Sequence, residues 1–265
     1  VIFMNQYVEL QNNDDIDLMV IATPTNTHFN ILSHFKNNKN IQLFFVEKPL
    51  FGNTDEYQKI DKLLKKKLFI NYIRNFEPNI KKLKNDIYNL KYKNIDKIIV
   101  NYTKGLKNNG SHMISLINFL FNSPKIISSK VLGTKEGFNE EDPTYDVYIE
   151  VKYMKKTIPI YFIGLNHNNY AIFELELYFE NKKIEIIDSS QELKFFEIQN
   201  DREYPEYKVI SNKPKIVKLG FSNLMGYAYD EIYSILNNEK IVLSYEEENS
   251  NQIFLNTILK EKSDD

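Results

Sequence analysis

The stretch LFFVEKPLFG, residues 43–52, decides how the first part of this chain folds. Its four large apolar residues, Leu43 to Val46, are typical of a strand that is buried on both faces of a parallel sheet. Pro49 ends the strand because proline has no backbone N–H to donate. Ligands bind beyond the carboxyl ends of the strands in such sheets. Lys48 is therefore either a solvated cation at a strand end or a functional one.

Two similar strands are predicted on either side of this one. Residues 17–22 form a short apolar run that ends at a turn, and residues 68–70 form another. The segments between the strands have the apolar periodicity of helices, so the order of elements is βαβαβ. This order with short connections predicts a parallel, doubly wound, Rossmann-like sheet.

The two helices between these strands have candidate caps at their starts. We expect Asn26 or Thr27 to cap the first helix and Asn53 or Thr54 to cap the second, because short polar side chains accept from the first free amides. Each helix is predicted to bury one apolar face, formed by Phe29, Ile31, Leu32 and Phe35 in the first and by Tyr57, Ile60, Leu63 and Leu64 in the second.

Beyond residue 74 the pattern changes to that of an α+β domain. Helices are expected at about 77–92, 111–121, 222–237 and 245–260, and strands at 97–102, 147–151, 160–163, 173–179, 184–187 and 195–198. Most of these strands alternate apolar and polar residues, which predicts a large, mostly antiparallel open sheet. The predicted fold class is thus α/β, an incomplete Rossmann-like parallel sheet (1–74) followed by an α+β domain with the large sheet (75–265); the roles of substrate binding and dimerisation for the second domain are implied by the resemblance described below.

Composition limits the possible functions. The 265 residues carry a net charge of −2 with both signs interspersed, so nothing indicates nucleic-acid or polybasic membrane binding. No apolar run approaches the roughly 18 residues of a membrane span. The chain has no cysteine, which excludes disulfides and thiolate sites and fits a reducing cytoplasm. Its four histidines lack the spacing of metal ligands, so we expect no metal site.

Four segments in order carry a resemblance to a known family. They are DLMVIATPTNTHFNIL (17–32), VEKP (46–49), NYIRNFEP (71–78) and NNGSHMISLINFL (108–120), and together they resemble the ordered motifs of the Gfo/Idh/MocA oxidoreductases. The resemblance implies an NAD- or NADP-binding Rossmann domain and a substrate that is a sugar, a sugar nucleotide or a related polyol. It also implies a homodimer or homotetramer that assembles through the C-terminal sheet.

The resemblance assigns roles to the residues at the end of the 43–46 strand. Lys48 would lie between the nicotinamide ribose and the substrate as a positioning and electrostatic residue, Glu47 would contact the ribose hydroxyls, and Pro49 would fix the turn. Elementary chemistry supports a cation here, because hydride leaves a carbinol carbon as its hydroxyl loses a proton, and the site needs a base and a positive charge beside that oxygen.

The loop after the first strand would also contact the cofactor. In the family this loop touches the nicotinamide end, which carries over to Thr23, Pro24, Thr25, Asn26 and His28 of this chain. The alternative for His28 is an ordinary histidine on the solvent face of a helix.

The resemblance places the proton-transfer residue at His112, at the start of a helix. Imidazole suits this role because it exchanges protons near neutral pH; the alternative is a capping or packed histidine. Asn108 stands where many members have Asp, and an amide can hold a substrate hydroxyl without sharing its proton. Ser115 also replaces an expected Asp. Arg74 and Lys104 are candidates to bind a substrate phosphate or carboxylate, or else are ordinary surface cations.

One expected motif is missing. The dinucleotide fingerprint needs closely spaced glycines, and no two glycines of this chain are two residues apart. We therefore interpret residues 1–3 as what remains of a third strand and expect on the order of 50 residues, one βαβ unit and more, to be missing before them. Such a chain would bind NAD or NADP weakly. The alternative function is a non-catalytic ligand-sensing or scaffold protein with the same fold.

Overall fold

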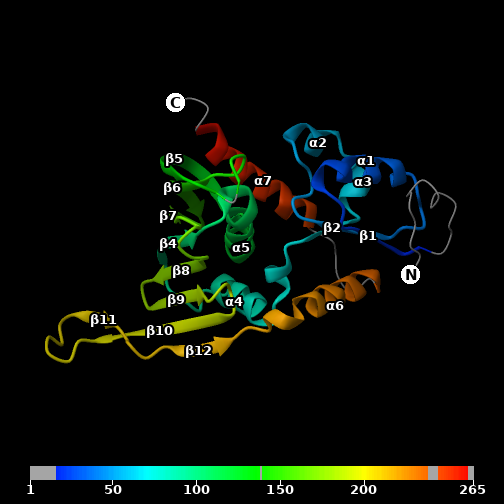
Figure 1. Ribbon diagram of the computed structural model, residues 1–265. Coiled ribbons are helices and arrows are strands. Elements are labelled where there is room, and N and C mark those ends of the chain that lie inside the picture. Colours follow the sequence, from blue (N-terminus) through cyan, green and yellow to red (C-terminus); the bar gives the residue numbers. More distant parts are fainter. Residues whose placement is uncertain (1–15, 138, 238–243, 262–265) are drawn as a thin grey trace. The chain divides into compact units, whose positions relative to one another are not determined.

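The computed structural model describes residues 16–137, 139–237 and 244–261, which form two compact units (Figure 1). The first unit comprises residues 1–73 and 225–252, and the second comprises 74–224 and 253–265. The boundary predicted after residue 74 lies next to the first of these transitions, but no local pattern indicated that residues 225–252 return to the first unit. The strand expected at residues 1–3 lies outside the described residues.

The described residues of the first unit form a three-stranded parallel sheet. Its strands are β1 (Leu18–Ile21), β2 (Leu43–Glu47) and β3 (Leu68–Asn71), in the order β1-β2-β3. Leu18 pairs with Leu43, and Phe44 with Leu68, so all three strands end at the same edge. The predicted parallel sheet is confirmed, and Lys48 follows β2 at its carboxyl end.

Period-2 alternation along β2 places its side chains in two layers. Phe44 and Val46 pack in a core with the helices α1 (Thr25–Phe35), α2 (Thr54–Lys59) and α3 (Lys62–Lys65). Phe45 faces the other side, where its ring lies 6.4 Å from that of Tyr229 in α6 (Leu224–Leu236). Figure 1 shows α1–α3 on one side of this sheet and α6 on the other. This burial on both faces explains the uninterrupted apolar run.

Two details of these helices correct the sequence prediction. The residue before α1 is Pro24, whose side chain makes no capping hydrogen bond, so the prediction of Asn26 or Thr27 as the cap is wrong. The predicted second helix is divided into α2 and α3, because Ile60 is extended and Asp61 starts a new turn. Leu63 consequently lies outside the core, 67% exposed. The cap at Asn53 is confirmed, with Glu56 completing a capping box.

The second unit contains a nine-stranded sheet. Its order is β11-β10-β9-β8-β4-β7-β6-β5, with β12 also paired to β10. The strands are β4 (Ile95–Tyr102), β5 (Lys125–Lys135), β6 (Thr144–Tyr153), β7 (Lys156–Gly164), β8 (Phe173–Phe179), β9 (Lys182–Ile187), β10 (Glu192–Asn200), β11 (Lys208–Ile210) and β12 (Lys215–Lys218). Among these described strands only β4 and β7 run parallel, so the predicted mostly antiparallel sheet is confirmed. The strands β5, β11 and β12 were not predicted.

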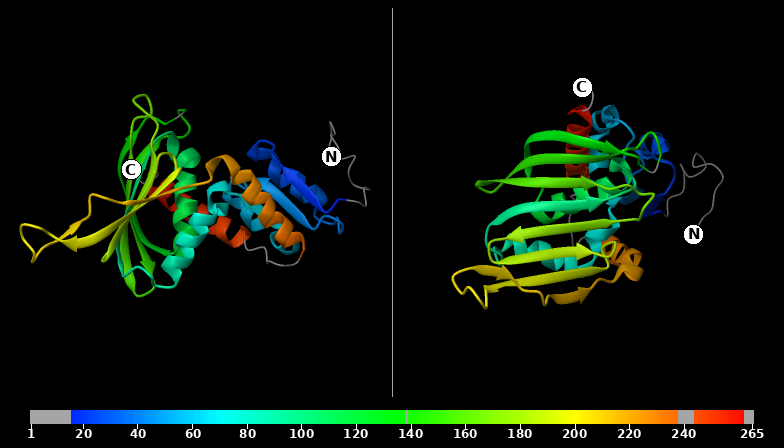
Figure 2. Two further views of the ribbon diagram at one scale, coloured as in Figure 1. Left: turned by 90° about the horizontal axis from the view of Figure 1, so that it is seen from below. Right: turned by 60° about the vertical axis from the view of Figure 1, so that its left-hand side comes forward.

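Helices cover one face of this sheet (Figure 2). Helix α4 (Pro78–Tyr88), helix α5 (Ser111–Phe121) and the last turns of α7 (Ser244–Glu261) share a single core with its inward side chains. The prediction for α5 matches both ends, whereas α4 is shorter than expected. Among the described residues, no helix is long and apolar enough to cross a membrane.

Candidate functional site

The turn after β2 brings the ends of two strands together. Glu47 is the register partner of Asn71 at the end of β3, and the Asn71 amide donates to Glu47 Oε1 at 2.6 Å. The other amide atom, Asn71 Oδ1, is buried and has no hydrogen-bond partner in the described part of the chain. Lys48 follows directly, half-buried, and its peptide bond to Pro49 is cis. This strand edge therefore presents a carboxylate, an orphaned carbonyl oxygen and an ammonium group.

The loop between β1 and α1 lies at the same edge of the sheet. The hydroxyls of Thr23 and Thr27 lie 2.6 Å apart, and Thr27 donates to the Pro24 carbonyl at 2.7 Å. Thr25 begins α1 and Asn26 is exposed. Because Pro24 supplies no capping side chain, the first amides of α1 have no side-chain acceptor from the cap position.

His28 ties this loop to the turn after β2. Its ring is fully buried, with Nε2 2.8 Å from the Thr23 carbonyl oxygen and Nδ1 3.0 Å from the Leu50 carbonyl oxygen. The interpretation of a solvent-facing histidine is therefore wrong. With each nitrogen close to a backbone oxygen, the ring links the loop after β1 to the turn after β2.

A buried carboxylate holds the other side of the Leu50 peptide. Glu248, in the part of α7 that belongs to the first unit, accepts from the Leu50 amide at 3.1 Å and from the Tyr57 hydroxyl at 2.7 Å. Gln252 also donates to it, at 3.3 Å. Burial raises the pKa of Glu248, and these donors only partly oppose the shift. Sequence reasoning missed this residue, because nothing in the run Glu246 to Glu248 marks which side chain points inward.

In the second unit, His112 stands in the first turn of α5. It is half-buried, and its ring centroid lies 6.4 Å from that of Phe173 at the start of β8. The helix continues from a wide turn, η3 (Gly105–Gly110), and the Ser111 hydroxyl donates to the Asn108 carbonyl at 2.8 Å. Asn108 and His112 are therefore held four residues apart on one continuous helical segment.

A second acidic residue positions this wide turn. Asp142 is buried and accepts from the backbone amides of Lys107 at 2.7 Å and Asn108 at 2.9 Å. Gly105 has φ +86°, and a Cβ there would lie 2.2 Å from Asp142 Oδ2, so only glycine fits. Sequence reasoning missed Asp142 because it comes from a loop more than thirty positions away in the chain.

Arg74 lies against the same aromatic ring as His112. Its guanidinium carbon is 4.2 Å from the Phe173 ring centre and 5.7 Å from that of Phe221. Burial lowers the pKa of Arg74 to about 10. Among the described residues no carboxylate pairs with it, and its buried Nε has no hydrogen-bond partner. The structure thus brings Arg74 and His112 together around Phe173.

The remaining predicted residues have different surroundings. Lys104 is half-buried with a left-handed backbone, φ 65°, and in the described part of the chain its side chain makes no ion pair. Ser115 is buried in α5 and accepts from the Asn75 amide at 3.0 Å, so it has a structural contact where an Asp was expected.

We expect replacement of Arg74 by methionine to raise stability. The unpaired guanidinium is charged below its pKa of about 10, so its burial disfavours folding there, and this cost shrinks as pH rises through that value. Removing it should raise the free energy of unfolding by about 1 kcal/mol after loss of the ring contact. Urea unfolding at neutral pH measures this. Arg202→Met, at an exposed position, is the matched control, and a clearly destabilised Arg74→Met would contradict the expectation.

Comparison with known proteins connects these features to a family. Residues 1–72 match the GFO_IDH_MocA model, described as an oxidoreductase family with an NAD-binding Rossmann fold. This segment is therefore similar to the NAD-binding domain of the family that the four ordered motifs indicated. A search of curated proteins gave no match.

Solved structures share the fold of both units. An oxidoreductase of Bacillus subtilis, YvaA, is 17% identical with a TM-score of 0.72 over 98% of this chain and 83% of its own. A Sinorhizobium meliloti oxidoreductase is 13% identical with a TM-score of 0.74 over 97% and 82%. The transcriptional regulator Gal80p of Kluyveromyces lactis is 14% identical with a TM-score of 0.70 over 97% and 77%.

Proposed function

We propose that this protein transfers a hydride between NAD or NADP and a secondary hydroxyl or keto group of a sugar or sugar nucleotide. In the oxidative direction the carbinol C–H bond breaks, its electron pair leaves as hydride, and the hydroxyl proton passes to a base. Three products result: a ketone, the reduced nicotinamide and a protonated base. The match of residues 1–72 to an NAD-binding oxidoreductase family supports the hydride chemistry, while the substrate class rests on the cations and polar groups of the second unit.

The roles follow from the chemistry of each side chain. His112 takes the hydroxyl proton, Lys48 stabilises the developing negative charge on the substrate oxygen, and Asn108 holds a neighbouring hydroxyl. Lys104 and Arg74 bind an anionic group of the substrate.

The observation that carries the substrate class is the unpaired Arg74. A buried guanidinium without a carboxylate partner is costly, and a phosphate or carboxylate of a ligand would satisfy it in bidentate geometry. Because Phe173 contacts both Arg74 and His112, an anion held by Arg74 would lie near the proton-transfer residue. A sugar nucleotide or a sugar acid provides both an anion and a secondary hydroxyl.

The first unit has side chains that suit a nicotinamide cofactor. When bound, the oxidised cofactor would accept the hydride. Glu47 and the orphaned Asn71 Oδ1 are acceptors suited to ribose hydroxyls or a carboxamide. Thr23, Pro24, Thr25 and Asn26 would contact the same cofactor, and His28 would fix their loop. The choice between NAD and NADP stays open in this proposal; one similar structure is described as an NADPH-dependent oxidoreductase.

The test is an assay of the complete product of the gene that encodes this chain. Reduction of NAD and of NADP is followed by absorbance over a panel of neutral sugars, sugar acids and sugar nucleotides. The proposal expects turnover with anionic members, and Arg74→Met should raise KM for them more than for neutral sugars. Absence of turnover with every member would contradict it.

A second candidate is a non-catalytic ligand sensor or scaffold with this fold. Two observations favour it: Asn108 cannot share a proton as an Asp would, and the similar Gal80p is described as a transcriptional regulator. Thermal-shift measurements separate the two candidates. A sensor would be stabilised by cofactor or sugar nucleotide while showing no nicotinamide reduction.

The open face of the large sheet is the proposed surface of a homodimer or homotetramer. On this face Tyr161 and Ile163 of β7 are 37% and 38% exposed, and the Tyr148 ring lies 5.2 Å from that of Tyr161. We expect light scattering to show at least a dimer, and the double substitution Tyr161→Glu with Ile163→Glu to yield a monomer. Tyr88→Glu, on the exposed end of α4, is the control. A monomeric unsubstituted protein would contradict this expectation.

The composition of the chain supports a proposed location and set of partners. A cysteine-free chain with interspersed charges suits a cytoplasmic protein that acts on small molecules, without nucleic-acid or membrane partners.

A further inference from the structure

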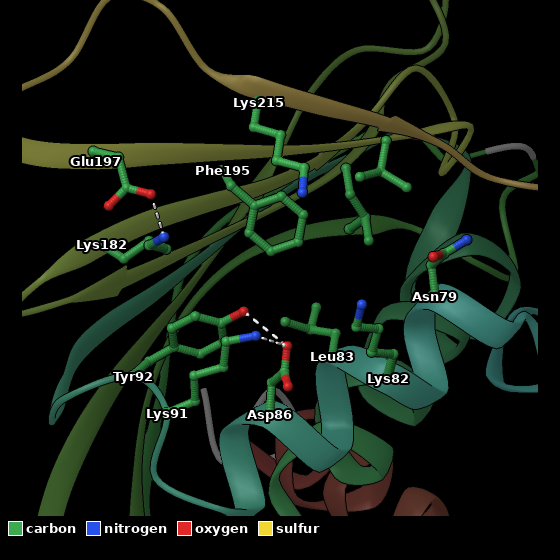
Figure 3. Close-up of a pocket in the computed structure, with 12 residues that line it drawn as sticks. Asn79, Lys82, Leu83, Asp86, Lys91, Tyr92, Lys182, Phe195, Glu197 and Lys215 are labelled. Carbon is green, nitrogen blue, oxygen red and sulfur yellow. Dashed lines mark hydrogen bonds and ion pairs between the residues drawn. The ribbon is translucent and has the colours of Figure 1, made fainter.

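A groove lies within the second unit between helix α4 and the strands β9, β10 and β12 (Figure 3). Its volume is about 220 Å³. That is below the roughly 300–1,000 Å³ of sites for drug-sized ligands, so an occupant would be small. None of its lining residues is among those proposed to bind cofactor or substrate, so a function of this groove does not rest on the proposed hydride transfer.

Four lysines and two carboxylates line the groove, and both carboxylates are already engaged. Asp86 accepts from Lys91 at 2.8 Å and from the Tyr92 hydroxyl at 3.2 Å. Burial, and then Asp86, raise the pKa of Tyr92, which keeps its proton on the hydroxyl. Glu197 forms an ion pair with Lys182 at 2.5 Å. Each carboxylate therefore has its own cation within the groove wall.

The other two lysines are left over. Lys82 comes from α4 and Lys215 from the start of β12, and neither side chain makes an ion pair or hydrogen bond within the described ranges of the chain. Figure 3 shows both ammonium groups pointing into the space between helix and strands. Four positive and two negative charges leave an excess of two positive charges in one small groove. A phosphate monoester, with a charge of about −1.5 to −2 near neutral pH, would balance this excess.

The groove also has apolar surface that bare phosphate would not use. The Phe195 ring lies between Lys182 and Lys215, and Leu83 approaches it from α4 (Figure 3). Leu193 and Val217 contribute from neighbouring strands, where they are register partners. An aromatic face beside cations suits a flat ring that carries an anionic group.

We propose that this groove is a binding site for a small phosphate monoester with a flat ring, in which Lys82 and Lys215 hold the phosphate and Phe195 contacts the ring. Helix α4 and the strands β10 and β12, all in the second unit, supply the contacts of the bound ligand. Its binding weakens as salt concentration rises, because the lysines are at the surface.

The test uses phenyl phosphate as the probe. The protein is titrated with phenyl phosphate, and the methyl NMR signals of Leu83, Leu193 and Val217 are followed. Two further probes are titrated for comparison: inorganic phosphate, which lacks the ring, and benzyl alcohol, which lacks the charge. The double substitution Lys82→Ala with Lys215→Ala removes the unpaired cations. Lys208→Ala with Lys213→Ala, at exposed positions outside the groove, changes the net charge by the same amount.

The proposal expects saturable shifts of these methyl signals with phenyl phosphate and weaker binding of both other probes. Loss of two charge-assisted contacts should weaken phenyl phosphate binding by about tenfold or more, while the control pair changes it by about twofold or less. Absence of saturable shifts would overturn the proposal, as would equal weakening by both pairs of substitutions. Equal affinity for inorganic phosphate would overturn the assignment of the ring.

Discussion

Replacement of Lys48 by methionine is expected to lower kcat for the proposed sugar substrate by about 10²–10³-fold, the effect of removing one preorganised group that stabilises an oxyanion. Methionine keeps the length of the side chain but not the charge. The half-buried position of Lys48, directly after β2, limits the access of water that would otherwise replace the ammonium group. KM should change little, because the charge on the substrate oxygen develops in the transition state.

Steady-state assays of the complete gene product measure this effect. Lys62→Met is the matched control, since Lys62 is exposed on α3, and it should retain the unsubstituted rate. In the oxidative direction His112→Ala should lower kcat by about 10²–10⁴-fold and remove the fall in rate at low pH, the acidic limb of the pH–rate profile, as expected for loss of a general base. Full turnover by both Lys48→Met and His112→Ala would exclude the proposed roles.

Replacement of Glu248 by alanine is expected to lower the free energy of unfolding by about 3–5 kcal/mol. The substitution leaves the Leu50 amide and the Tyr57 hydroxyl without their acceptor, in a place where water does not reach. It also leaves a cavity where the carboxylate was. Urea unfolding of the chain measures the difference.

Two other variants separate the contributions. Glu248→Gln keeps an acceptor for the Leu50 amide, and Asn251, which donates to the second oxygen at 3.4 Å, can rotate to accept from the new amide; a loss of about 1 kcal/mol or less is expected. Tyr57→Phe, which removes one donor, should cost about 1 kcal/mol. An alanine variant as stable as the glutamine variant would show that the hydrogen bonds at Glu248 contribute nothing.

The same residue sets a pH dependence. Because the pKa of Glu248 is raised in the folded state, its protonated form is favoured there relative to the unfolded chain. Its contribution to stability is therefore complete below the ordinary value of 4.5 and decreases as pH rises through the folded-state value. Glu248→Gln should be less sensitive to pH in this interval.

Local signals in the sequence predicted much of the fold. The apolar run predicted β2, because a strand buried on both faces is apolar at every position. The helical periodicity predicted α5, because a helix that packs on a sheet carries one apolar stripe. Both signals lie within the segment itself. The edge strand β5 was missed because its exposed residues include Lys125, Ser128 and Lys130, which lack an apolar alternation. The break between α2 and α3 was missed because Leu63 and Leu64 both fit a continuous helix by spacing.

The candidate site was predicted in part for the same reason. Motif residues such as Lys48 and His112 stand beside local signals, a strand end and a helix start. Glu248 and Asp142 act on backbone amides that are distant in sequence, Leu50 and Asn108, and no local pattern indicates such a contact. The aromatic contacts of Arg74 with Phe173 and Phe221 likewise depend on tertiary packing.

The contacts of the Leu50 peptide bear on any attempt to produce the first unit as a separate fragment that ends near residue 74. Its carbonyl is held from α1 and its amide from α7, so three segments spread over more than two hundred positions converge on one peptide group. A recombinant fragment that stops at residue 74 would lack the carboxylate supplied from near the opposite terminus. The first unit is thus contiguous in space but not along the chain, and a fragment that contains it must include residues 225–252 as well as those up to residue 73.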